Sequence, residues 1–122
     1  MNILAVGAGG FFGAVTRYLM GRIPFPACAF PLATFAANLL GAVIIGIVFA
    51  LTAKLGGSDS GMVLFLKTGF CGGLTTFSTF SLEGLSLIQD GNAGLFAIYA
   101  ALSVGMCLLG AALGNAIGNM AA

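Results

Sequence analysis

The sequence contains no histidine and no tryptophan, and it has few charged side chains, four basic and three acidic among 122 residues. Its three cysteines fall one to a segment without a CxxC pair, so neither a zinc site nor a redox pair is expected. No carboxylate pair lies at the centre of an apolar run, and no serine or cysteine has a base close to it in the sequence. We therefore expect that the protein is not an enzyme.

The scarcity of charge also limits the partners. The net charge is +1, and there is no basic run or acidic tail, which argues against nucleic acid and against an anionic membrane surface as partners. The first residues lack the Lys or Arg that a secretory signal places before its apolar core, so we interpret them as a membrane span. The expected partners are a small solute, the lipid bilayer and another copy of the chain.

Apolar residues and glycine dominate the composition. The chain is 60% hydrophobic with 20 glycines, and its mean hydropathy is +1.15, which indicates an integral membrane protein. A membrane-spanning helix needs roughly 20 apolar residues. The sequence thus predicts an all-α membrane protein with four spans at about residues 2–20, 32–53, 62–88 and 94–118, forming one transmembrane domain over residues 1–122.

The third span contains the most unusual stretch, a glycine pair at Gly72 and Gly73 followed by hydroxyl side chains alternating with phenylalanines. As an unbroken helix this span would measure ~40 Å against a hydrocarbon core of ~30 Å. We expect the helix to break near Gly72 and Gly73, because non-helical backbone at membrane depth is tolerated only where it is buried in protein or lines a wet cavity. Such a break points to an ion or substrate path, whereas the alternative is that the small residues only allow close helix packing.

Polar residues in the first two spans each have two interpretations. Gly9 and Gly13 form a small-xxx-small face that suits close packing of two helices. Arg17 lies near the end of the first span, where an arginine ordinarily extends towards the interface. Asn38 either forms hydrogen bonds that only hold two helices together or donates amide hydrogen bonds to an anion. Thr34, four residues earlier, shares its helix face.

The second half of the chain carries a further polar set. Tyr99, Ser103 and Cys107 recur at every fourth position and form a mildly polar stripe on the fourth span. Tyr99 is an alternative candidate for an interface aromatic, although it lies deep for that position. Glu83 follows the expected break by about two turns, and an ordinary wetted charge near the interface is its simplest interpretation.

The basic residues give no preferred orientation. With four spans both termini share one side, and Lys54 and Lys67 lie towards that side while Arg17 and Arg22 lie towards the other. A chain without a preference under the positive-inside rule can insert both ways, so two opposite copies can pair about an axis in the membrane plane. The alternative is that four basic residues are too few to indicate any orientation or lack of one.

The remaining chemistry suits a small anion. The potassium-channel motif TVGYG is absent, and the first span lacks the deep acidic residue that a proton-coupled exporter would need. Phe77 and Phe80 are three residues apart, so they share a helix face at about 5 Å, where they either pack or present positive ring edges to a path. Hydroxyls, an amide and ring edges can hold an anion without the full charge that would trap it.

Three stretches closely resemble the Fluc family of fluoride channels, also called CrcB, found in bacteria and other microbes. They are Gly9-Gly10-Phe11-Phe12-Gly13-Ala14-Val15-Thr16-Arg17-Tyr18, Asn38-Leu39-Leu40-Gly41 and Gly72-Gly73-Leu74-Thr75-Thr76-Phe77-Ser78-Thr79-Phe80-Ser81-Leu82-Glu83. The likeness extends over the whole chain, and the third stretch is specific. The resemblance implies a dual-topology antiparallel homodimer with two pores, which exports fluoride passively across the plasma membrane (the inner membrane in bacteria) and protects the cell from fluoride toxicity.

The resemblance also implies roles for particular residues. Phe77 and Phe80 would be the pore phenylalanines, with Asn38 donating to fluoride nearby. The implied lining and vestibule residues are Ser103, Tyr99, Thr79, Glu83 and Arg17, and the backbone carbonyls of Gly72 and Thr75 would hold a structural sodium ion at the dimer centre. Cys107 stands where some members carry a serine, and a thiol is a weaker donor. The competing hypothesis is a small transporter or packing subunit, which predicts coupled flux or none.

Overall fold

The computed structural model describes residues 1–122, the whole chain. All of its regular structure is helical. The helices are α1 (Asn2–Met20), α2 (Leu32–Ala50), α3 (Gly61–Val63), the π-helix η1 (Leu64–Cys71), α4 (Gly72–Leu74), α5 (Phe77–Gln89) and α6 (Ala93–Ala121).

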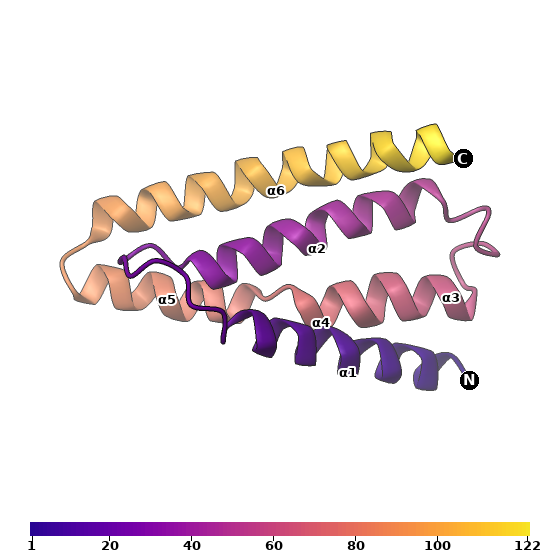
Figure 1. The fold of residues 1–122 in the computed structure, drawn as a ribbon, viewed down its shortest axis with the longest axis horizontal. Coiled ribbons are helices and arrows are strands. Elements are labelled where there is room, and N and C mark those ends of the chain that lie inside the picture. The colour runs from indigo at the N-terminus through magenta and orange to yellow at the C-terminus, as the bar shows by residue number, and fades with distance from the viewer.

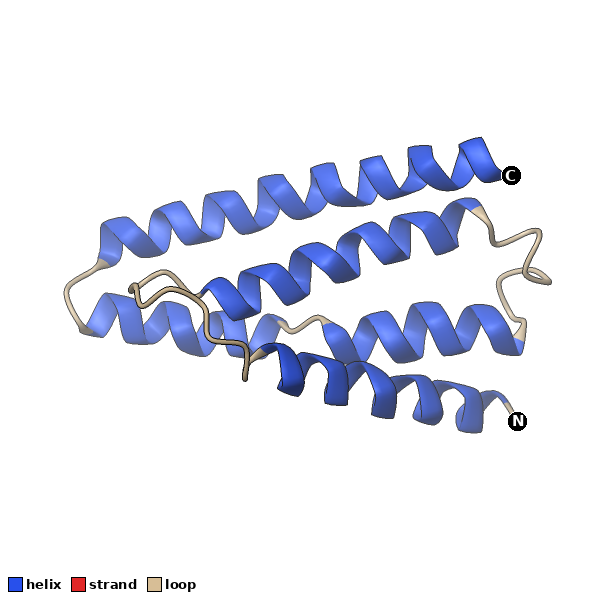
Figure 2. Cartoon of the chain, viewed as in Figure 1, coloured by secondary structure: helices blue, strands red, loops and turns tan.

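These helices form four long segments that run alternately in opposite directions, with both termini at the same end (Figure 1). Three of the segments, α1, α2 and α6, are long and apolar enough to cross a membrane as single helices. The fourth is the composite segment from α3 to α5, which is interrupted once by loop (Figure 2). The predicted all-α membrane fold with a broken third helix is therefore confirmed.

Two boundaries differ by more than one residue from the sequence prediction. The second helix ends at Ala50 and not at residue 53, because the chain enters a run of turns in which the N–H of Gly57 donates to the carbonyl of Thr52 at 2.9 Å. Gly56 and Gly57 adopt φ of 100° and 91°, which other residues rarely reach, and so the chain reverses at these two glycines. The last helix continues to Ala121, beyond the predicted residue 118.

The break in the third segment lies at Thr75 and Thr76, close to the glycine pair near which it was predicted but two residues after it. Gly72 still has helical φ and ψ of −63° and −36°, whereas Thr75 and Thr76 are extended, with ψ of 155° and 119°. Thr76 is the N-cap of α5, and its side-chain oxygen accepts a hydrogen bond from the N–H of Thr79 at 3.1 Å. A threonine cap, rather than glycine flexibility, thus sets where the helix restarts.

Glycines on two segments bring α1 against the broken helix. A Cβ atom on Gly69 would lie 2.8 Å from the Cα of Gly9, and one on Gly73 would lie 2.6 Å from the carbonyl oxygen of Gly10. On the α1 side, a Cβ on Gly13 would lie 2.9 Å from the backbone nitrogen of Leu74. These backbones touch without side chains between them, so the predicted close packing through Gly9 and Gly13 is confirmed.

A second glycine seam joins α2 to α6, which lie side by side in Figure 1. A Cβ on Gly46 would lie 2.8 Å from the backbone nitrogen of Asn115, and one on Gly118 would lie 2.6 Å from the Cβ of Ala50. The subunit therefore consists of two tight helix pairs, α1 with the broken segment and α2 with α6.

Replacing Gly13 with alanine tests the first seam. The added methyl would clash with the backbone of Phe70 and Leu74, which cannot move aside as a flexible side chain could. We expect Gly13→Ala to destabilise the fold by about 1–3 kcal/mol, read as a lower thermal unfolding temperature in detergent. Gly7→Ala is the matched control, because nothing lies within 4 Å of the new methyl, and a neutral or stabilising effect is expected there. Equal unfolding temperatures for the two variants would contradict the packing described.

Candidate functional site

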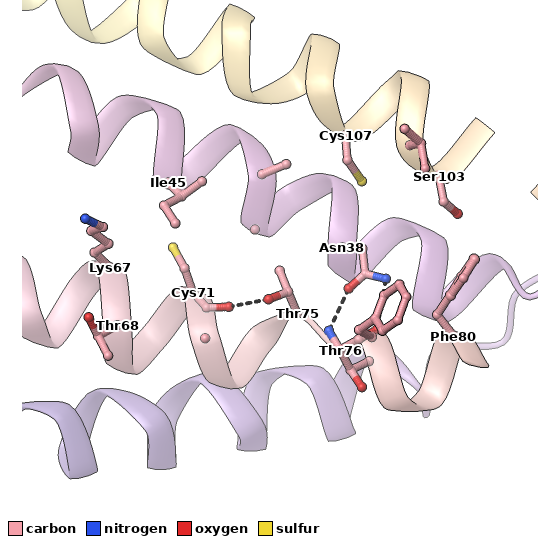
Figure 3. A pocket seen from close by; sticks show the side chains of 15 residues that line it. Asn38, Ile45, Lys67, Thr68, Cys71, Thr75, Thr76, Phe80, Ser103 and Cys107 are labelled. Carbon is pink, nitrogen blue, oxygen red and sulfur yellow. Dashed lines mark hydrogen bonds between the residues drawn. The ribbon is translucent and has the colours of Figure 1, made fainter. Parts of the chain in front are cut away.

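A groove with a volume of about 570 Å³ runs between α2, α6 and the broken third segment (Figure 3). Its lining combines hydroxyl, thiol, amide and phenyl groups with a single charged side chain. The lining residues are Asn38, Gly41, Ala42, Ile45, Lys67, Thr68, Cys71, Gly72, Thr75, Thr76, Phe77, Phe80, Ser103, Val104 and Cys107.

Asn38 holds the break from the neighbouring helix α2. The N–H of Thr76 donates to Asn38 Oδ1 at 2.8 Å, and Asn38 Nδ2 donates to the carbonyl of Thr76 at 3.3 Å (Figure 3). The side-chain amide thereby replaces the helical partners that Thr76 lacks. Since the amide nitrogen carries two hydrogens and only one is used, the second is free to serve a ligand in the groove. Both sequence interpretations of Asn38, as a hydrogen-bonding link between helices and as a donor to an anion, are compatible with this geometry.

The interruption leaves backbone groups of both polarities without partners. The carbonyls of Gly72, Leu74 and Thr75 accept no hydrogen bond, and the N–H groups of Phe77 and Ser78 donate none. Gly72 is exposed, with open space where a side chain would stand. Carbonyl oxygens therefore project at the end of α4, and amide hydrogens at the start of α5.

Phe77 and Phe80 both line the groove, as their spacing predicted. Their ring centroids are 5.5 Å apart and the rings are stacked at 28°. Phe77 is 79% exposed on the single chain, whereas Phe80 is half-buried against the ring of Tyr99 at 4.9 Å. Phe80 thus packs as well as lining the groove, and Phe77 stands free to meet a ligand or another chain.

Glu83 is half-buried and hydrogen-bonded to two neighbouring helices, which its interpretation as an ordinary wetted charge did not include. Thr34 Oγ1 donates to one carboxylate oxygen at 2.9 Å, and the hydroxyl of Tyr99 donates to the other at 3.0 Å. Tyr99 is completely buried, with the ring of Phe30 packed edge-on at 5.2 Å, so it is not an interface aromatic. The predicted shared face of Thr34 and Asn38 is confirmed, because both contact the third segment, Asn38 at the break and Thr34 at Glu83.

Ser103 lies one turn from Tyr99 and is the only residue with a buried side-chain oxygen or nitrogen that lacks a hydrogen-bond partner. Its hydroxyl lines the groove, and Cys107 follows one turn later, half-buried on the same wall (Figure 3). The predicted polar stripe therefore faces inward, with Tyr99 buried and Ser103 and Cys107 at the groove. A buried hydroxyl without a partner is costly unless a ligand or water completes it.

Arg17 lies beside the break in the third segment. Its Nε donates to the carbonyl of Gly73 at 3.1 Å. With Arg22, Thr34 and Thr79 it lines a second cavity of about 260 Å³. The candidate residues therefore divide between two cavities: Thr79 and Arg17 face the second, while Asn38, Phe77, Phe80 and Ser103 face the groove.

The residues that line the two cavities but were not predicted as site members include Thr34, Lys67, Thr68, Cys71 and Thr76. A signal existed for two of them. Thr76 precedes a helical run that it can cap, and Lys67 is a charge inside a predicted span, which is itself a reason to suspect a functional site. The contact between Thr34 and Glu83 joins residues 49 apart in the sequence, so no local pattern could have revealed it.

Comparison with known proteins connects the whole chain to one family. The family described as "CrcB-like protein, Camphor Resistance (CrcB)" matches residues 4–115. A protein of Ruminiclostridium cellulolyticum named "Fluoride-specific ion channel FluC" is 42% identical over 117 residues, which cover 94% of this chain and 90% of the relative. Proteins with the same name are 47% identical in Chlorobaculum tepidum, covering 89% and 84%, and 41% identical in Clostridium novyi, covering 96% and 93%.

Replacing Asn38 tests how the break is held. Asn38→Leu removes both partners of Thr76 while keeping a similar volume, so the N–H and carbonyl of Thr76 would lose their hydrogen bonds. We expect a loss of about 1–3 kcal/mol, measured as a lower thermal unfolding temperature in detergent. Asn119→Leu, at an exposed position on α6, is the control. An Asn38→Leu protein as stable as the wild type would contradict the bracing role.

Proposed function

The chain belongs to the CrcB family, and from that premise we propose that it is a fluoride-specific ion channel that lets fluoride leave the cell passively and so protects it from fluoride toxicity. It is a multi-pass protein of the plasma membrane, the inner membrane of a bacterium, and not an enzyme. The observation that carries the proposal is the buried, unpartnered hydroxyl of Ser103 in a groove that also presents the free amide hydrogen of Asn38.

The groove lining suits fluoride because it offers several weak partners instead of one strong one. A dehydrated fluoride ion loses strong hydrogen bonds to water, and the replacements must be numerous yet weak enough to release it. Asn38, Ser103 and the ring edges of Phe77 and Phe80 carry no full charge. Thr79 and Arg17 at the second cavity, with Glu83 and Tyr99 between the cavities, would continue the path.

A second copy of the chain, inserted in the opposite direction, would complete the channel as an antiparallel homodimer with two pores. The exposure of Phe77 and the open side of the groove support this proposal, as does the even division of basic residues between the two ends. Reporter fusions at the C-terminus should give signal on both sides of the membrane. A wholly one-sided signal would count against dual topology.

The break also fits a structural sodium ion at the dimer centre. The unpartnered carbonyls of Gly72 and Thr75 are the oxygen ligands that a hard cation prefers, and two chains would supply four of them. The ion would hold the two crossing segments together and would take no part in moving fluoride. Removing sodium should lower the thermal stability of the dimer. Unchanged stability would contradict the proposed sodium site.

Fluoride efflux from liposomes that contain only this protein tests the function itself. With potassium fluoride inside and valinomycin to carry the counter-charge, we expect rapid efflux on a fluoride electrode, unaffected by a proton gradient. Chloride in place of fluoride is the control and should not move. Efflux coupled to a proton gradient would instead indicate a transporter, and absence of efflux would indicate a packing subunit.

The phenylalanine pair gives a test of the path. We expect Phe77→Ile and Phe80→Ile each to cut fluoride efflux by about tenfold or more, as removing ~1.4 kcal/mol of stabilisation from the rate-limiting barrier would do. Methionine at either position should be milder, because its polarisable thioether keeps part of the interaction.

The control for this series is Phe49→Ile, since Phe49 is exposed at the end of α2 and lies outside the groove. Each variant should still elute as a folded dimer. Wild-type efflux in a folded double variant, Phe77→Ile with Phe80→Ile, would show that the rings serve packing alone.

A further inference from the structure

Lys67 is the one charged side chain in the lining of the groove. It belongs to η1 and lies six residues after the start of the third segment at Gly61, which is about 9 Å along a helix axis. In Figure 3 it lies at the opposite end of the groove from Phe80 and Ser103. A charge placed within a membrane-spanning segment is costly, and such residues generally face a water-filled cavity on an ion path.

No protein group neutralises this ammonium. Arg17 donates to the carbonyl of Gly73 and Lys54 donates to the carbonyl of Ala121, whereas Lys67 donates to no acceptor. Of the three acidic residues, Glu83 is already bonded to Thr34 and Tyr99, while Asp59 and Asp90 lie outside the helices. The positive charge of Lys67 therefore acts on whatever enters the groove.

Lys67 lines the same groove as the residues at the break. Lys67, Cys71 and Thr75 follow one another at intervals of four residues, and all three line the groove. The apolar side chains of Ile45 and Val104 also line the groove. Low-dielectric walls focus the field of a charge along a cleft and raise the local concentration of counter-ions.

We propose that Lys67 is the residue that gathers small hard anions at the groove mouth, so that it sets the rate at which fluoride reaches Asn38 and the phenylalanines. This inference rests on the proposed fluoride channel. Arg17 and Arg22 hold the corresponding place at the second cavity, and the path of one chain thus carries cationic side chains at both cavities. The fluoride held at Lys67 stays mobile, because the lysine is exposed and its charge is hydrated.

The test is the dependence of efflux on ionic strength in the liposome assay. Potassium isethionate, whose anion is much larger than fluoride, sets the ionic strength at about 0.01 M or about 1 M, where the screening length is ~30 Å or ~3 Å. At low ionic strength we expect Lys67→Gln to reduce the initial rate by about three- to tenfold, and Lys67→Glu to reduce it further. At high ionic strength both should approach the wild-type rate, and Lys67→Arg should match the wild type throughout.

Lys54→Gln is the matched control, since Lys54 lies in the loop after α2 and outside the groove. Wild-type rates for Lys67→Gln at low ionic strength would overturn the proposal. So would an equal reduction at both ionic strengths, because a packing role does not depend on screening. Efflux through the wild-type protein in the same series tests the channel function separately. If the wild-type protein conducts fluoride and the Lys67 variants conduct it equally well, only the proposed role of Lys67 is refuted.

Discussion

The pair of hydrogen bonds between Asn38 and Thr76 is the interaction on which the site depends. In hydrocarbon, each backbone group without a partner costs several kcal/mol, so an extended pair of residues cannot interrupt a helix without compensation. Asn38 supplies both a donor and an acceptor from the adjacent helix. The interruption is thereby confined to Thr75 and Thr76, and the residues on either side return at once to helical geometry.

The two glycine seams, α2 against α6 and α1 against the broken segment, determine which atoms the side-chain amide of Asn38 can reach. Because α2 touches α6 backbone to backbone at Gly46 and Gly118, Asn38 and Ser103 are held at fixed heights on neighbouring walls of the groove. The other seam presses α1 against η1 and α4, which brings Arg17 to the carbonyl of Gly73. The π-helical winding of η1 lies along this contact, in keeping with the frequent occurrence of such windings at functional sites.

Hydropathy and spacing were sufficient for the four segments, the existence of a break and the shared face of Phe77 and Phe80. The sequence did not show that the break falls at Thr75 and Thr76 and not at the glycine pair itself, since this depends on a cap and on an amide 38 residues away in the sequence. The hydrogen bonds of Glu83 were missed for a related reason. Its depth follows from contacts with α2 and α6, and hydropathy within one segment carries no information on them.

The break explains how a chain with so few charged side chains could serve both a cation and an anion. The unpartnered carbonyls of Gly72 and Thr75 lie at the C-terminal end of the helix before the break. The free N–H groups of Phe77 and Ser78 lie at the N-terminal end of the helix after it. Two opposite partial charges thus lie within six residues, supplied by the backbone alone. Partial charges attract an ion without the binding strength of a buried carboxylate or ammonium, which suits an ion that must leave again. The basic side chains in the lining belong to the two cavities, Lys67 to the groove and Arg17 and Arg22 to the second cavity.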